Sequence, residues 1–156
     1  MLATIFQIGL FIFCYVSVWF VISLLIKRND IADIAWGLGF VAVVCFLFLT
    51  QAPTLQSVIV YILTIIWGMR LSIHICLRTK GKPEDFRYKK WRDEWGKYFV
   101  LRSYLQVYLL QGFFMWIISV PILVVSMAKN QPISLFMFVG LIIWLIGFAF
   151  ESIGDY

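Results

Sequence analysis

Five apolar runs, each about 20 residues long and nearly free of charge, set the limits on what this chain can fold into. They cover residues 2–26, 31–50, 54–76, 103–127 and 133–153. A helix needs roughly 20 apolar residues to cross the hydrocarbon core of a bilayer. The composition agrees, because 63% of the residues are hydrophobic and 13% are charged, whereas soluble domains have about a quarter charged residues. We therefore expect an all-α, polytopic membrane bundle of about five transmembrane helices in one domain.

The distribution of Lys and Arg predicts the orientation of this bundle. Eleven basic residues lie in the first and third loops, and Lys129 is the single one in the second and fourth loops. Because loops rich in Lys and Arg stay on the cytoplasmic side, we expect the N-terminus outside and the C-terminus in the cytoplasm.

Three other classes are excluded by pattern. The first run is not a signal peptide, because no positive charge precedes it and Lys27 and Arg28 follow it. Cys14, Cys45 and Cys76 lie in apolar runs without metal-ligand or paired spacing, so we expect no metal site and no disulfide framework. Nucleic acid is not an expected partner either, since membrane orientation accounts for the basic loops.

The third loop, residues 78–102, is the long polar passage of the chain, and water-soluble molecules should meet the protein there. Four acids are interleaved with nine of the thirteen basic residues. This loop would lie at the cytoplasmic mouth of a cavity between the helices. Arginines at such a place, here Arg87 and Arg92, are natural partners of cofactor phosphates. A basic loop of this kind also fits a module that merely contacts anionic lipids.

Two clusters of polar side chains are expected inside the membrane. Asp33 and Arg70 both lie about 25 Å from the turn that joins the second and third runs, at 1.5 Å per residue, and we expect them to pair. The alternative is that Arg70 extends to the interface.

The second expected cluster joins the last two runs as a hairpin, and it brings four side chains together: Tyr104, Tyr108, Glu151 and Asp155. The alternative is two helix ends with ordinary interfacial residues. Gly140 and Gly147 share a stripe with Glu151, and such glycines let a neighbouring helix approach closely.

Several stretches resemble the bacterial DUF1295 family, within the steroid 5-alpha-reductase-like membrane enzymes. They are Asp33-Ile34-Ala35-Trp36-Gly37, Trp67-Gly68-Met69-Arg70-Leu71 with His74, Gly81-Lys82-Pro83-Glu84-Asp85-Phe86-Arg87-Tyr88 with Trp91-Arg92, and Phe150-Glu151-Ser152-Ile153-Gly154-Asp155-Tyr156. The resemblance implies a bundle of about seven helices, so that residues 1–156 would be the N-terminal part of a longer domain. It also implies an integral protein of the bacterial inner membrane.

The resemblance further implies NADPH as cofactor, with Glu151 and Asp155 at the positions that hold it. The segment from His74 to Thr79 is similar to one whose Tyr donates a proton in the eukaryotic reductases, and here that position is Ile75. Another acid must then serve, and Tyr88 and Tyr108 are the candidates, since tyrosine can act as a general acid.

The implied reaction is reduction of a lipophilic enone or polyprenoid-like substrate that enters from the bilayer among membrane lipids. Residues 1–156 alone are expected to give no turnover, because the family's C-terminal cofactor segment is not among them. One alternative is a membrane methyltransferase of the isoprenylcysteine carboxyl type. Another is a non-enzymatic membrane module that binds anionic lipid or a partner.

Overall fold

The computed structural model describes residues 2–129, 132 and 134–155, and within them the chain is helical, with no strand. Five helices are long and apolar enough to cross a membrane, which confirms the predicted fold class. The orientation of the termini stays a prediction. The elements are α1 (Leu2–Ile26), α2 (Ile31–Thr50), α3 (Leu55–Thr79), α4 (Phe86–Trp95), the 3-10 turn η1 (Gly96–Tyr98), α5 (Phe99–Ser103), the π-helical segment η2 (Tyr104–Leu109), α6 (Leu110–Met127) and α7 (Leu135–Gly154).

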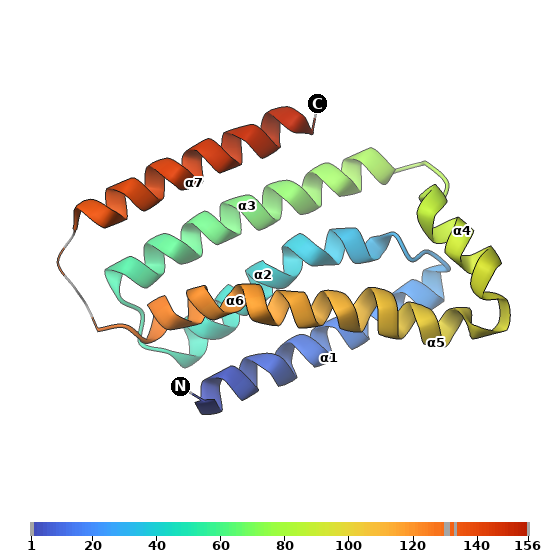
Figure 1. Cartoon of the computed structure of the whole chain (residues 1–156), viewed down its shortest axis with the longest axis horizontal. Helices are drawn as coiled ribbons and strands as arrows, with labels where there is room; N and C mark the ends of the chain where they lie inside the picture. The colour runs from blue at the N-terminus through green and yellow to red at the C-terminus, as the bar shows by residue number, and fades with distance from the viewer. Residues whose placement is uncertain (1, 130–131, 133, 156) are drawn as a thin grey trace.

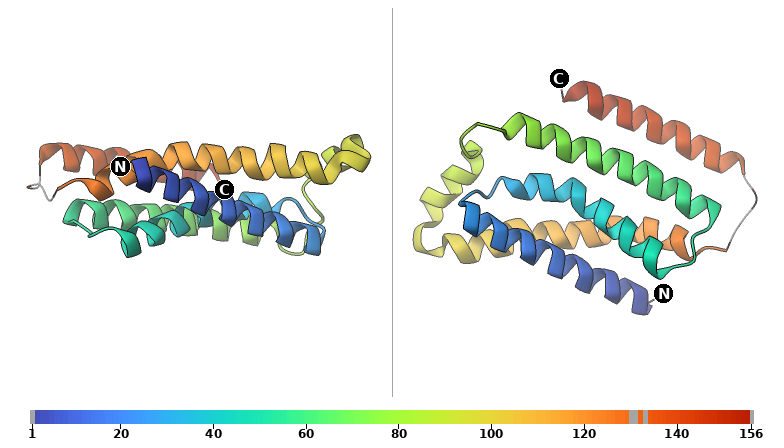
Figure 2. Two further views of the ribbon diagram at one scale, coloured as in Figure 1. Left: turned by 90° about the horizontal axis from the view of Figure 1, so that it is seen from below. Right: turned by 180° about the vertical axis from the view of Figure 1, so that it is seen from behind.

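The helices lie roughly side by side, in the order α7, α3, α2, α1, with α6 across the face of α1 to α3 (Figure 1). Figure 2 shows α6 and α4 from two further directions, with α4 at one end of the bundle. The chain begins α2 and finishes α3 at that same end, which we call the α4 end. The polar loop of residues 78–102 is largely helical, because it contains α4, η1 and most of α5. It covers this end of the bundle (Figure 1).

The best-packed helix is α2, which lies at the centre of the bundle. Ala32, Phe40, Val43 and Leu47 are all buried, and they recur at helical spacing, as a core-facing stripe must. Small residues bring α2 against α3, because a Cβ built on Gly37 would lie 2.6 Å from the carbonyl oxygen of Gly68. Such close backbone approach is typical of helix pairs in membranes.

Polar cross-links also join the helices. The Ser72 hydroxyl of α3 donates to the Ile34 carbonyl of α2 at 2.9 Å, and the Tyr15 hydroxyl of α1 donates to the Ala35 carbonyl at 2.8 Å. The indole of Trp116 in α6 donates to the Ile5 carbonyl at 3.1 Å. In a medium without water, hydrogen bonds of this kind fix which helices are neighbours.

The last helix does not form the expected hairpin with α6. Instead, α7 lies beside α3 (Figures 1 and 2), and none of its described residues is buried. The expected close approach at the α7 glycines is also missing, since nothing in the described chain lies within 4 Å of a Cβ built on Gly140 or Gly147. Ile133, where this run was expected to begin, lies outside the described residues.

Candidate functional site

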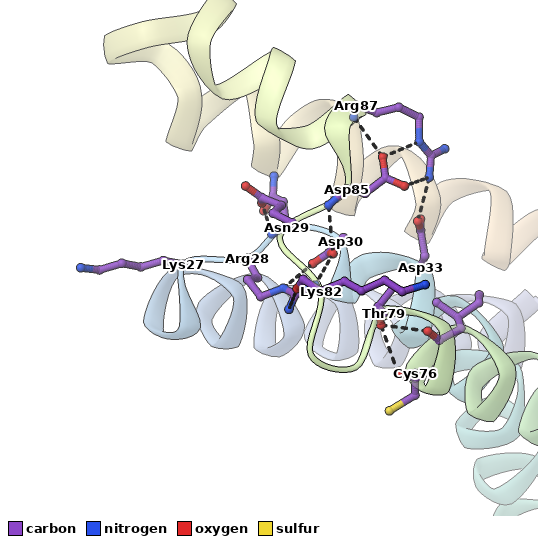
Figure 3. Close-up of polar contacts among 12 residues, drawn as sticks. Lys27, Arg28, Asn29, Asp30, Asp33, Cys76, Thr79, Lys82, Asp85 and Arg87 are labelled. Atoms are coloured by element: carbon purple, nitrogen blue, oxygen red, sulfur yellow. Dashed lines mark hydrogen bonds and ion pairs between the residues drawn. The ribbon is translucent and has the colours of Figure 1, made fainter.

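The residues that join α1 to α2 form the centre of a polar network at the α4 end. Asp30, which is 3% exposed, accepts two hydrogen bonds from the Arg28 guanidinium at 2.6 and 3.0 Å. It also accepts from the backbone amide of Asp85 at 3.2 Å, while Arg28 donates to the Lys82 carbonyl at 3.0 Å (Figure 3). The buried Asp30 carboxylate thus ties the loop before α4 to the start of α2.

Tyr88 on α4 and Asp33 on α2 make the next contact of the network. Tyr88 is 3% exposed, and its hydroxyl donates to the Asp33 carboxylate at 2.8 Å. The other Asp33 oxygen accepts from the Arg87 guanidinium at 3.2 Å, and the Arg87 side chain is 48% exposed. A buried phenol is therefore linked through one carboxylate to a side chain that reaches solvent.

Asp85 begins α4 and orients Arg87. Its carboxylate accepts from the Arg87 backbone amide at 2.9 Å, as an N-cap residue does, and from the Arg87 side chain at 3.0 Å (Figure 3). The hydrogen bond from the Arg87 guanidinium holds the pKa of the Asp85 carboxyl below its ordinary value, because it stabilises the charged form.

Glu84 and Arg92 continue the network on the side of α5. The Arg92 guanidinium bonds both Glu84 carboxylate oxygens, the shortest contact being 3.0 Å, and it lies over the Phe99 ring at 4.1 Å. Glu84 also accepts from the backbone amide of Asn29 at 2.7 Å. Arg92 is thus held on one side by charge and on the other by an aromatic face.

The π-helical segment η2 places Tyr108 against the same corner. The Tyr108 hydroxyl lies 3.5 Å from the backbone carbonyl oxygen of Asn29, and the side-chain amide of Asn29 donates to the Ser103 hydroxyl. Tyr108 is 1% exposed, so this phenol is fully inside the bundle. Tyr104, in the same segment, turns instead to Ser17 of α1, with 2.9 Å between their hydroxyl oxygens. π-Helical segments often occur at functional sites.

A separate polar group, the α3–α7 cluster, consists of Trp67, Arg70, Glu151 and Asp155. The Arg70 guanidinium pairs with Glu151 and with Asp155, each at 2.6 Å. The Trp67 indole donates to Glu151 at 2.7 Å. The two carboxylates, one helical turn apart on α7, therefore face α3 and are held in place from it.

Both expected intramembrane clusters are therefore wrong in their pairing. Arg70 binds the acids of α7, and Asp33 binds α4. Tyr108, in η2, contacts Asn29 and not Glu151. The reason is that α7 lies beside α3 (Figure 1), where Glu151 and Asp155 find their countercharge in Arg70.

The predicted site residues thus divide between the two groups. Arg87, Tyr88, Arg92 and Tyr108 belong to the network at the α4 end, and Glu151 and Asp155 belong to the α3–α7 cluster. No hydrogen bond or ion pair recorded among the described residues joins the two groups. Sequence reasoning missed Asn29 and Glu84 as the residues that connect the network, although a short polar corner between two apolar runs marks Asn29.

Apolar grooves lie between the membrane helices, away from the network. One of about 370 Å³ runs between α3, α6 and α7 and has among its lining residues Thr64, Gly140 and Trp144. Trp144 stacks on Phe148, whose ring lies 5.4 Å from the Arg70 guanidinium. Two aromatic side chains, Trp144 and Phe148, thus lie between the lining of this groove and Arg70 of the α3–α7 cluster. Within the described residues no group of His, Cys, Asp and Glu is arranged to hold a metal ion.

Comparison with known proteins places the chain in a family. The model of the family described as "Protein of unknown function (DUF1295)" matches residues 19–156, nearly the whole chain. The chain belongs to the DUF1295 family. No curated protein and no solved structure matches it. The match includes both polar groups of this DUF1295 chain, together with the helices that hold them, and five apolar helices agree with an integral membrane protein.

Proposed function

We propose that this DUF1295 chain belongs to an NADPH-dependent membrane reductase of lipophilic enones. The observation that carries the proposal is the buried Tyr88 hydroxyl, bonded at 2.8 Å to Asp33, at the end of a membrane bundle. An isolated phenol inside a protein cannot regain a proton after giving it away. Tyr88 has a carboxylate partner, and that carboxylate is linked to the half-exposed Arg87.

Tyr88 is then the proton donor of the reaction. In the reaction the Tyr88 hydroxyl would turn its proton from Asp33 to the carbon next to the carbonyl of the enone. A proton taken from water at the Arg87 side would then return to the phenolate through the Asp33 carboxylate. A positioned general acid contributes about 100- to 10,000-fold to a rate. Tyr108 is less suited to this role, because its hydroxyl is bonded to a backbone carbonyl, which cannot supply a proton.

The α3–α7 cluster fits the amide end of the cofactor. When bound, NADPH supplies the hydride. Glu151 and Asp155 offer carboxylate oxygens as acceptors for a carboxamide, and their side chains are 36% and 24% exposed. The buried Ser152 hydroxyl and Arg70 Nε have no hydrogen-bond partner within the described residues. Both groups could therefore form hydrogen bonds with a bound ligand.

Arg87 and Arg92 were expected at the cofactor phosphates, and this stays a prediction. Each guanidinium already binds carboxylates, Arg87 those of Asp33 and Asp85 and Arg92 that of Glu84. Binding of a phosphate to either arginine would have to compete with these ion pairs. Their present role is to hold α4, and with it Tyr88, against α2.

The groove between α3, α6 and α7 supports a lipophilic substrate. It is lined mainly by apolar side chains. Tyr88 is not among its lining residues, so the groove supports only the lipophilic class of the substrate, and the carbon that Tyr88 protonates would lie outside it, at the α4 end. An apolar molecule dissolved in the bilayer loses little by entering such a groove, whereas a polar molecule would lose its hydration.

Ligand-dependent stability of the full-length protein in detergent tests the cofactor assignment. We expect NADPH to raise the free energy of unfolding, by about 2.7 kcal/mol when its concentration is 100 times Kd. Glu151→Gln combined with Asp155→Asn should abolish the rise. Stabilisation by S-adenosylhomocysteine, with none by NADPH, would instead assign the protein to the methyltransferase class.

A further inference from the structure

Most of the acids at the α4 end form ion pairs with three arginines, Arg28, Arg87 and Arg92. Asp30 pairs with Arg28, Glu84 pairs with Arg92, and Arg87 pairs with both Asp33 and Asp85. The acid side chains in these pairs are between 3% and 24% exposed. Negative charge at this end is therefore mostly turned inward and neutralised.

Lys90 pairs with Glu94 at 3.7 Å, and both of these side chains are exposed. The other cations at this end are also exposed, and none of them has an ion pair in the part of the chain that the structure describes. Figure 3 shows one of them, Lys27, pointing away from the network, whereas the next residue, Arg28, binds Asp30 within the network. We call this set the outer cations: Lys27, Arg78, Lys80, Lys82, Lys89, Lys97 and Arg102.

Apolar side chains are exposed among these charges. Phe86, at the start of α4, is 76% exposed, Tyr98 is 55% exposed and Leu101 is 59% exposed. The Lys97 ammonium lies 5.0 Å from the centre of the Tyr98 ring. A surface that mixes cations with exposed aromatic and aliphatic side chains is typical of the region where lipid headgroups meet acyl chains.

We propose that the outer cations bind the anionic phospholipid headgroups of the adjoining leaflet and hold α4 against the membrane surface. Charge complementarity supports this proposal, because the seven outer cations are balanced by little free negative charge. Among the described residues at this end, Asp93 is the one exposed acid without an ion pair. The exposed apolar side chains favour a lipid over a soluble anion, since they gain nothing from a water-soluble partner. This inference is independent of the reductase proposal, which uses the inward-facing residues.

Native mass spectrometry of the full-length protein in a non-ionic detergent tests the proposal. We expect phosphatidylglycerol to bind more tightly than phosphatidylcholine of the same acyl chains, and added salt to weaken the difference. Replacing Lys89 and Lys97 with glutamine should weaken phosphatidylglycerol binding about fivefold per lysine. The matched control is Lys129→Gln, which removes an exposed lysine after α6, at the opposite end of the bundle, and it should leave binding unchanged.

Three results would overturn the proposal. The first is equal affinity of the wild-type protein for the two lipids, which needs no variant and so no assumption about folding. The second is a Lys89→Gln/Lys97→Gln protein with an unchanged circular dichroism spectrum and wild-type affinity for phosphatidylglycerol. The third is displacement of phosphatidylglycerol by an equal concentration of inorganic phosphate or NADPH, which would assign the outer cations to a soluble anion.

Discussion

Arg70 is the residue on which the attachment of α7 depends most. It binds two carboxylates of a helix that buries none of its described side chains. Replacing Arg70 with methionine would leave both carboxylates without their countercharge, and we expect a loss of about 1–3 kcal/mol in the free energy of unfolding. Chemical denaturation in micelles measures this loss.

Two further variants control that experiment. Arg78→Gln, on the same helix, removes an exposed guanidinium with no ion pair in the described chain, and it should cost little. Adding Glu151→Gln and Asp155→Asn to Arg70→Met should recover part of the loss, because the unpaired charges disappear with their partner. Strict additivity of the three changes would show that the cluster is not coupled.

Asp85 makes the start of α4 sensitive to acid. Its pKa in the folded protein lies below the ordinary value of 3.8, so the stabilisation is complete above about pH 4 and is lost as the pH falls through the folded-state pKa. Asp85→Asn keeps an N-cap residue but carries no charge. The difference in stability between wild type and Asp85→Asn should therefore be constant near neutral pH and shrink below pH 3.8. A difference that grows with acidification would contradict this assignment.

At the scale of helices, the contact of α2 with α3 depends on Gly37 and Gly68. A Cβ at Gly37 meets the Gly68 carbonyl, which is backbone and cannot turn away, so Gly37→Ala should cost about 1–3 kcal/mol. Gly147→Ala on α7 meets nothing within 4 Å in the described chain, and it should be neutral or slightly stabilising, because alanine favours helix. Thermal unfolding of the two variants compares them directly. Equal losses would mean that the close approach of α2 and α3 is not what Gly37 provides.

The sequence predicted some helices well and others not at all. The bounds of α2, residues 31–50, are those expected, because polar residues mark both of its ends. The helix α4 was missed, although Tyr88, Trp91 and Trp95 recur at helical spacing and Asp85 precedes them as a cap. The partner of α7 was missed for a different reason: a run of apolar residues says that a helix crosses the membrane, not which neighbour it meets. Its acids, Glu151 and Asp155, were noticed, but they were grouped with Tyr104 and Tyr108 and not with Arg70.

For the whole molecule, the predicted orientation places the α4 end in the cytoplasm. The outer cations and the network then lie on one side of the membrane, and Lys129 lies on the other. In a variant without Cys14, Cys45 and Cys76, a cysteine at residue 129 should react with an impermeant thiol reagent in intact cells. A cysteine at residue 82 should react only after the membrane is opened. The reverse pattern would place the proposed cofactor-binding end outside the cell.

The central claim is that Tyr88, held by Asp33, donates a proton during reduction of a lipophilic enone. It is tested by NADPH oxidation with such an enone as substrate, measured for the full-length protein and for Tyr88→Phe. We predict that kcat falls about 100- to 10,000-fold in Tyr88→Phe, while stabilisation by NADPH is unchanged, because Tyr88 lies outside the α3–α7 cluster. Wild-type kcat in a folded Tyr88→Phe protein would contradict the claim.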